Sequence, residues 1–263
     1  MCSEGMKLSI QARLDYTFTD PADVLVQLEA AAIPEQIIID QHIEFSDYEH
    51  FARVPAHNGI GERIWLRVHD QLTIDYHARV EVNRIIADIA GLERIPPHML
   101  PGETVEYLMP SRYCPSDRFQ ALADAEFGEL DGGARIMAMR DWVYTNIAYV
   151  SGSSDADTTA LDSFVKREGV CRDFAHVMIT LARAAGIPAR IASVYGLGVE
   201  PQDFHAVAEV FLSGEWHLID ATGMAHEAGM AKIGIGRDAA DVAFLTAYGD
   251  ATLREQTISV IEV

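Results

Sequence analysis

The chain has 263 residues, a length that can bury one large core or two smaller ones. Forty acidic side chains against twenty basic ones give a formal net charge of −20, which repels the phosphates of nucleic acids and of anionic membranes. We therefore expect no nucleic-acid partner and no membrane partner. A neutral or cationic substrate is compatible with this charge, although an acidic surface also serves solubility alone.

Alternating apolar and polar residues in the first hundred positions are typical of half-buried antiparallel strands. The two longest runs are residues 8–18 and 72–82, and residues 37–39 and 64–66 are further candidates. This pattern predicts an all-β domain, a sandwich or a barrel, over residues 1–110. Prolines between positions 96 and 115 interrupt regular structure, so we place a domain boundary there and a second domain at residues 111–263.

Apolar spacing becomes helical beyond this boundary. Residues 134–147 follow a Gly-Gly turn and are predicted to form a helix. Thr159 and Asp162 resemble a capping box for a second helix, which we expect to end at Gly169.

A third helix is predicted to begin at Cys171 and to end before Gly186. Free backbone N–H groups and the positive end of the helix dipole favour the thiolate, which is the reactive form of cysteine. Asp173 is expected to cap the helix and Arg172 to add positive potential. Cys171 is therefore the candidate nucleophile.

The other two cysteines are expected to have no role in chemistry. Three cysteines are too few and too scattered for a disulfide framework or a zinc ribbon, which favours a reducing compartment. Cys2 is interpreted as a thiol in a disordered terminus, and Cys114, followed by Pro115, as a structural residue. Because no signal-peptide-like or membrane-spanning segment is evident, we expect a cytoplasmic protein.

Strands are expected at about residues 188–196, 204–212 and 215–220, with Ser213-Gly214 as a two-residue hairpin turn. If this turn pairs Leu212 with Glu215, Asp220 lies diagonally across from His205 on the same face of the sheet. The spacing therefore predicts a hydrogen-bonded His–Asp pair.

These three residues suit one chemistry. A neutral His205 can accept the proton of Cys171 while Asp220 orients the ring, and the thiolate can then attack a carbonyl carbon. The backbone N–H of Cys171 is a ready donor to the oxyanion that forms. Trp142 and Tyr149 are both candidates for the second donor.

A metal site is the competing interpretation, because His176 and His217 add further ligand types. The spacing argues against it, since Cys171 and His176 are five residues apart on a helix and His217 should point away from Asp220. We expect no metal and no cofactor. His176 is then a polar residue of the core or the surface, and Glu209 either supports the site from behind or faces solvent.

Three sequence blocks, in this order, resemble the signature of the bacterial transglutaminase-like superfamily: residues 169–176, 203–206 and 216–220. The resemblance implies an α+β protein with a papain-like core, in which helices pack on an antiparallel sheet, preceded by a β-domain. It also implies Cys171 as nucleophile, His205 as general base and acid, and Asp220 as orienter. Many relatives carry a tryptophan two residues after the histidine, where this chain has Val207, which leaves the acyl-acceptor side of the site undefined.

The expected activity is thiol-dependent acyl transfer from amide bonds of a protein or peptide substrate. Hydrolysis of peptide or isopeptide bonds, as in a cysteine protease, is the preferred reading, and transfer to an amine, as in a transglutaminase, is the close alternative. A binding or scaffold protein that keeps the fold without catalysis is the alternative from another class.

Overall fold

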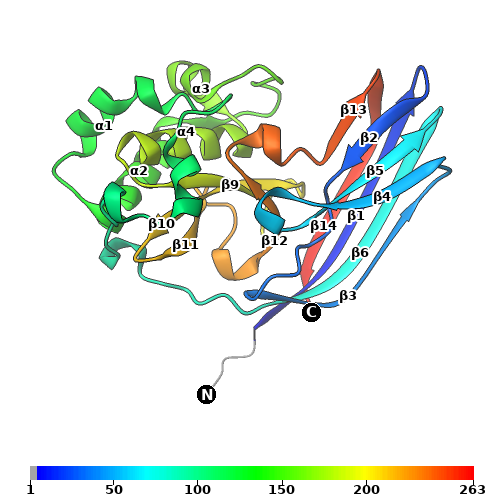
Figure 1. The fold of residues 1–263 in the computed structure, drawn as a ribbon, viewed down its shortest axis with the longest axis horizontal. Helices are drawn as coiled ribbons and strands as arrows, with labels where there is room; N and C mark the ends of the chain where they lie inside the picture. The colour runs from blue at the N-terminus through cyan, green and yellow to red at the C-terminus, as the bar shows by residue number, and fades with distance from the viewer. Residues whose placement is uncertain (1–4) are drawn as a thin grey trace.

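The computed structural model describes residues 5–263, so Cys2 lies outside the described residues. A β-sandwich occupies one side of the molecule, and helices packed on a third sheet occupy the other (Figure 1). This is the expected α+β class, with antiparallel main sheets. In the part of the chain described, no helix is long and apolar enough to cross a membrane.

The first sheet of the sandwich pairs the two longest alternating runs of the sequence. Leu8 lies opposite Val80, and both are fully buried. In spatial order, its strands are β14 (Ala251–Glu262), β1 (Met6–Phe18), β6 (Gln71–Val82) and β3 (Gln36–Phe45).

The second sheet faces the first across a shared apolar core. Its inward side chains include Val24 and Leu66, which are directly paired across neighbouring strands. In spatial order, its strands are β13 (Leu245–Tyr248), β2 (Ala22–Val26), β5 (Glu62–Val68) and β4 (His50–Pro55).

The sandwich is not a purely N-terminal unit. Strands β13 and β14 follow the helical region in sequence yet pair with β2 and β1, as Leu245 opposite Val26 and Glu262 opposite Leu8 show. The boundary predicted at residue 110 assigned both strands to the second domain. In the structure both strands belong to the sandwich, because β14 pairs with β1 and β13 pairs with β2.

The third sheet carries the predicted C-terminal strands and is antiparallel throughout. In spatial order, its strands are β11 (Glu215–Ile219), β10 (His205–Leu212), β9 (Ala189–Gly196) and β12 (Met230–Gly236). A separate short parallel pair joins β7 (Ala148–Tyr149) to β8 (Glu168–Gly169).

Helices cover one face of this sheet (Figure 1). The helices predicted at residues 134–147 and from Cys171 onward are confirmed, while α1 was not predicted. The helix with the capping box ends at Lys166, before Gly169, because Arg167 adopts a left-handed φ of 61°. The helices are α1 (Gln120–Phe127), α2 (Gly132–Asn146), α3 (Ala160–Lys166) and α4 (Cys171–Ala184).

Candidate active site

Cys171 is the first residue of α4, and its side chain is partly exposed. Asp173 caps this end as predicted, since its Oδ2 accepts a hydrogen bond of 2.8 Å from the backbone N–H of Val170. Arg172 donates to the carbonyl oxygen of Asp155 at 2.7 Å, so its guanidinium is anchored beside the helix start. The thiol therefore sits where the helix dipole favours a negative charge.

The β10–β11 hairpin has the predicted register. Ser213 and Gly214 both have positive φ, 50° and 90°, which is the geometry of a two-residue type I′ turn. Leu212 lies opposite Glu215, and Ala208 opposite Ile219. The chain leaves β11 one residue before Asp220, which therefore stands diagonally across from His205.

His205 and Asp220 form a direct, buried hydrogen bond. His205 Nε2 lies 3.0 Å from Asp220 Oδ2, and the two side chains are 0% and 5% exposed. The other ring nitrogen, Nδ1, makes no hydrogen bond to any described residue. The Cys171 sulfur is 4.0 Å from the carbonyl oxygen of Phe204, immediately before His205. The ring is thus held at one nitrogen and left unpaired at the other, beside the thiol.

The charge state of His205 follows from its partners. Burial alone would lower its pKa, but the hydrogen bond to Asp220 and the interaction with Cys171 outweigh burial and raise the pKa to about 9. Cys171 raises the pKa of His205 through its proximity, although Nδ1 of His205 makes no hydrogen bond to it. The imidazolium is therefore the favoured form at neutral pH.

Asp220 is fixed by further donors. Its Oδ1 accepts from the N–H and the hydroxyl of Thr222 at 2.8 and 2.7 Å, and its Oδ2 also accepts from the N–H of Ala225 at 3.0 Å. Burial would raise the pKa of Asp220, but His205, Thr222 and Ala225 together hold it below its usual value. The carboxylate is consequently ionised and oriented toward the ring.

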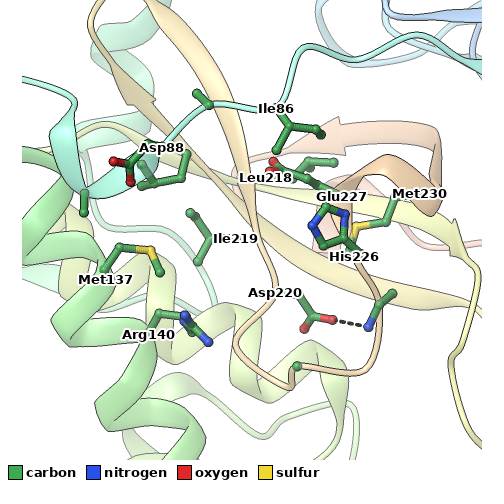
Figure 2. A pocket seen from close by; sticks show the side chains of 15 residues that line it. Ile86, Asp88, Met137, Arg140, Leu218, Ile219, Asp220, His226, Glu227 and Met230 are labelled. Atoms are coloured by element: carbon green, nitrogen blue, oxygen red, sulfur yellow. Dashed lines mark hydrogen bonds between the residues drawn. The ribbon is translucent and has the colours of Figure 1, made fainter. Parts of the chain in front are cut away.

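A cavity of about 390 Å³ opens behind this carboxylate, between α2, the edge strand β11 and residues 86–90 (Figure 2). Figure 2 shows Asp220 in its wall, together with Arg140 from α2 and His226 from the following loop. The residues that line the cavity include Asp220 but neither Cys171 nor His205. The cavity therefore lies behind the triad rather than over the thiol.

The two candidate oxyanion donors lie in different places. Trp142 stacks on Phe164 with ring centroids 5.2 Å apart, and the guanidinium of Arg167 covers its ring at 4.5 Å. Tyr149, in contrast, lies beside both the side chain and the backbone N–H of Cys171, and burial together with Cys171 raises its pKa to about 12. Of the two candidates, Tyr149 is the one that lies beside the thiol, and its hydroxyl is a candidate donor.

Glu209 does not face solvent, so that alternative is wrong. It is 1% exposed and accepts from Arg190 Nε at 2.6 Å and from Lys232 Nζ at 2.5 Å. Burial would raise the pKa of Glu209, but the two cations lower it to about 2. The residue is the centre of a buried ion-pair network.

The two other histidines considered as metal ligands, His176 and His217, lie apart from Cys171, His205 and Asp220. His176 is fully buried and stacks on Tyr113, with ring centroids 5.1 Å apart. His217 lines a separate cavity with Trp216 and Lys232. Within residues 5–263, no group of three or more His, Cys, Asp or Glu side chains is arranged to hold a metal ion.

Two comparisons place this site among known proteins. A family model described as "Transglutaminase-like superfamily" matches residues 121–221, which include Cys171, His205 and Asp220. A crystal structure from Cytophaga hutchinsonii, named a "putative cysteine protease", is 33% identical, with a TM-score of 0.94, and the match covers 99% of this chain and 92% of that one. The chain belongs to the transglutaminase-like superfamily.

Two further relatives match smaller parts of the chain. An uncharacterized protein of Mycobacterium leprae is 28% identical over 148 residues, covering 52% of this chain and 53% of that protein. An uncharacterized protein of Mycobacterium tuberculosis is 34% identical over 116 residues, covering 38% of this chain and 37% of that protein. The chain thus spans about half the length, or less, of these curated relatives.

Sequence reasoning did not assign roles to Thr222 and Asp203. Thr222 binds Asp220 through a local two-residue turn, a pattern that Asp-x-Thr directly after a strand could have indicated. Asp203 lies two residues before His205, within a block that the sequence singled out as a whole. Its position relative to the thiol depends on how the loop before β10 folds.

Proposed function

We propose that this protein is a thiol hydrolase that cleaves peptide or isopeptide bonds through a covalent acyl-enzyme on Cys171. One observation carries the proposal: His205 is bonded to Asp220 through Nε2 at 3.0 Å, while Nδ1 is left unpaired beside a thiol at a helix start. Thiol acyl transfer requires a nucleophile, a base beside it and a carboxylate that orients the base, and this arrangement supports that reaction.

In the proposed reaction, the proton of Cys171 Sγ already lies on His205 Nδ1, as a thiolate–imidazolium pair, and the thiolate attacks the amide carbon. The backbone N–H of Cys171 and the hydroxyl of Tyr149 donate to the oxyanion. The imidazolium then protonates the leaving amine, the C–N bond breaks, and a thioester remains. Water, deprotonated by His205, attacks the thioester and releases the acid.

Transfer of the acyl group to an amine shares every step up to the thioester. The partial exposure of Cys171 and the 40% exposure of Tyr149 favour water as the second reactant, because a transferase must keep water away from its thioester. A reducing compartment such as the cytoplasm suits this chemistry, since the thiol must stay reduced.

Alkylation tests the activated thiol. Iodoacetamide at mildly acidic pH, followed by peptide mapping, should modify Cys171 much faster than Cys114, which is fully buried, and faster than Cys2. His205→Ala should slow the modification of Cys171 and remove its advantage over Cys2, while the buried Cys114 stays slow in both proteins. Equal rates for the three thiols, or an unchanged rate in His205→Ala, would favour a binding protein without catalysis.

Product analysis separates the two enzymatic outcomes. The protein is incubated with a quenched peptide and a labelled primary amine, and the products are resolved by mass spectrometry. Hydrolysis predicts the free acid as the main product. Accumulation of the labelled amide would instead assign the chain to the transferases.

A further inference from the structure

The segment just before His205 contacts the thiol through its backbone and also carries a carboxylate. The carbonyl oxygen of Phe204 lies 4.0 Å from Cys171 Sγ, and Asp203 is the next residue upstream. Asp203 is exposed, and it lies within electrostatic range of both His205 and Tyr149, since it contributes to the raised pKa of Tyr149. The loop that contacts the thiol therefore also carries this carboxylate.

One oxygen of that carboxylate is free. Asp203 Oδ1 accepts from the backbone N–H of Phe204 at 2.7 Å and from the side-chain amide of Gln256. Among residues 5–263, none donates a hydrogen bond to Asp203 Oδ2, and none forms an ion pair with Asp203. The guanidinium of Arg172, at the start of α4, is bonded to the Asp155 carbonyl and to Asp173. Asp203 is thus a carboxylate near the site without a cationic partner.

The sandwich holds this carboxylate in place. Gln256 belongs to β14, and the side chain of Gln202 bonds both backbone groups of Val260 on the same strand, at 3.2 and 3.3 Å. The loop before β10 is therefore attached to β14 at two points. Although Asp203 is exposed, it is partly shielded by its surroundings, and this desolvation raises its pKa; the donors Phe204 and Gln256 offset the effect only in part, so a cation beside the free oxygen would stabilise the carboxylate further.

We propose that Asp203 determines specificity by binding a cationic group, an ammonium or a guanidinium, on the molecule that reacts at Cys171. The half-exposed ring of Tyr149 would flank the aliphatic stem or the charge itself. The overall charge of −20 attracts such a substrate over longer range. The inference deepens the proposed function and rests on it for the identity of the reacting group.

The cation has two possible sources, a Lys or Arg side chain next to the scissile amide, or a free amine that accepts the acyl group. The experiment compares wild type with Asp203→Asn. Glu255→Gln serves as the control, because this exposed residue neighbours Gln256 on the strand and its loss changes the net charge equally.

Turnover is measured on three quenched peptides that differ only in the residue beside the scissile bond, which is Lys, Gln or Glu. Wild type and Glu255→Gln should prefer Lys over Gln, and Asp203→Asn should lose about fivefold in kcat/KM for Lys while keeping its rate for Gln. In a second arm, the Gln peptide is combined with increasing dansylcadaverine. A raised KM for this amine in Asp203→Asn alone assigns the site to the acceptor.

Binding makes the result independent of turnover. Cys171→Ala should bind the fluorescent Lys peptide more tightly than the Gln peptide, and the additional Asp203→Asn change should remove that difference. If no variant turns over any peptide but this difference persists, the proposed function fails and the cation site stands. Equal effects of Asp203→Asn on Lys and Gln peptides in both assays, with no effect on the amine, would overturn the inference.

Discussion

Within residues 5–263, two groups of cysteine, histidine and aspartate differ in how their members are bonded. Cys171, His205 and Asp220 meet at the start of α4. Cys114, His176 and Asp238 meet along the same helix, where Cys114 Sγ donates to the carbonyl oxygen of His176 at 3.7 Å. The residue types are the same, so the difference lies in which atoms are bonded to which.

The two histidines titrate in opposite directions for this reason. His176 Nε2 accepts from the N–H of Ala239 at 3.1 Å, and both oxygens of Asp238 are taken by the backbone N–H groups of Tyr113 and Ala240. Burial therefore lowers the pKa of His176 to about 4, although Asp238 is nearby. For His205, in contrast, the hydrogen bond that Asp220 accepts from the ring, together with the interaction with Cys171, outweighs burial.

The two thiols differ in exposure and in what surrounds them. Cys114 is fully buried, and burial raises its pKa to about 12, so it remains a thiol. Cys171 is partly exposed and faces the unpaired nitrogen of His205. A buried cysteine near a histidine and an aspartate is consequently no indication of reactivity by itself.

The largest effect is expected from removing the nucleophile. Cys171→Ala should lower kcat by about 10⁴-fold or more, because no acyl-enzyme can form. Cys114→Ala is the matched control and should keep kcat within about twofold while lowering the thermal unfolding midpoint by a few degrees. Loss of turnover in Cys114→Ala, at a temperature where the variant is folded, would contradict the assignment.

The two aspartates should separate next. Asp220→Asn leaves His205 without its anionic partner and should lower kcat by about 10³- to 10⁴-fold. It should also shift the alkaline limb of the alkylation profile from about pH 9 toward lower pH, because burial then lowers the histidine pKa. Asp238→Asn should destabilise the fold without moving that limb, which stopped-flow alkylation would show.

A tyrosine accompanies each group, and the two should differ in effect. Tyr149→Phe removes the proposed oxyanion donor and should lower kcat by about 10²-fold with little change in KM. Tyr113 stacks on His176 and donates its hydroxyl to the Ala156 carbonyl at 2.7 Å. Tyr113→Phe should leave kcat unchanged. Equal losses in the two variants would remove Tyr149 from the reaction.

The smallest effects concern stability against pH. The raised pKa of His205 means that its contribution is complete below pH 6.5 and is lost as pH rises to about 9. The lowered pKa of His176 means that its contribution is complete above pH 6.5 and is lost as pH falls to about 4. His205→Gln should flatten the alkaline side of the unfolding-midpoint curve, and His176→Gln the acidic side.

Calorimetry from pH 4 to 10 checks both variants. His98→Gln, which changes an exposed histidine, is the control and should leave the curve unchanged. Flattening of the same side by both substitutions would show that hydrogen-bond connectivity does not set the two pKa values.

Local patterns made the central geometry predictable. Ser213-Gly214 fixes the hairpin register, and the register places Asp220 across from His205. The start of α4 at Cys171 follows from the apolar spacing and from the residues before it. These features depend on neighbours within about 20 residues, which is the range that periodicity and turn chemistry cover.

Contacts between distant segments were not predictable in this way. Tyr149 rather than Trp142 lies at the thiol because of where the chain leaves α2, and Glu209 is buried because Arg190 and Lys232 come from two neighbouring strands. Strand β14 has only Ile258 and Val260 as buried apolar positions, too short an alternation to indicate its pairing with β1. Periodicity reports which face is buried, and it does not report the partner.

The pairing of β14 with β1 sets the order in which the molecule can be completed during translation. Residues 6–18 emerge from the ribosome well before residues 251–262, so β1 lacks one of its two neighbouring strands until β14 has been synthesised. Because Gln256 on β14 also bonds Asp203, the loop beside the thiol gains this attachment only after β14 has been synthesised. A nascent chain can therefore fold α4 and the β10–β11 hairpin before the surface around Cys171 is complete.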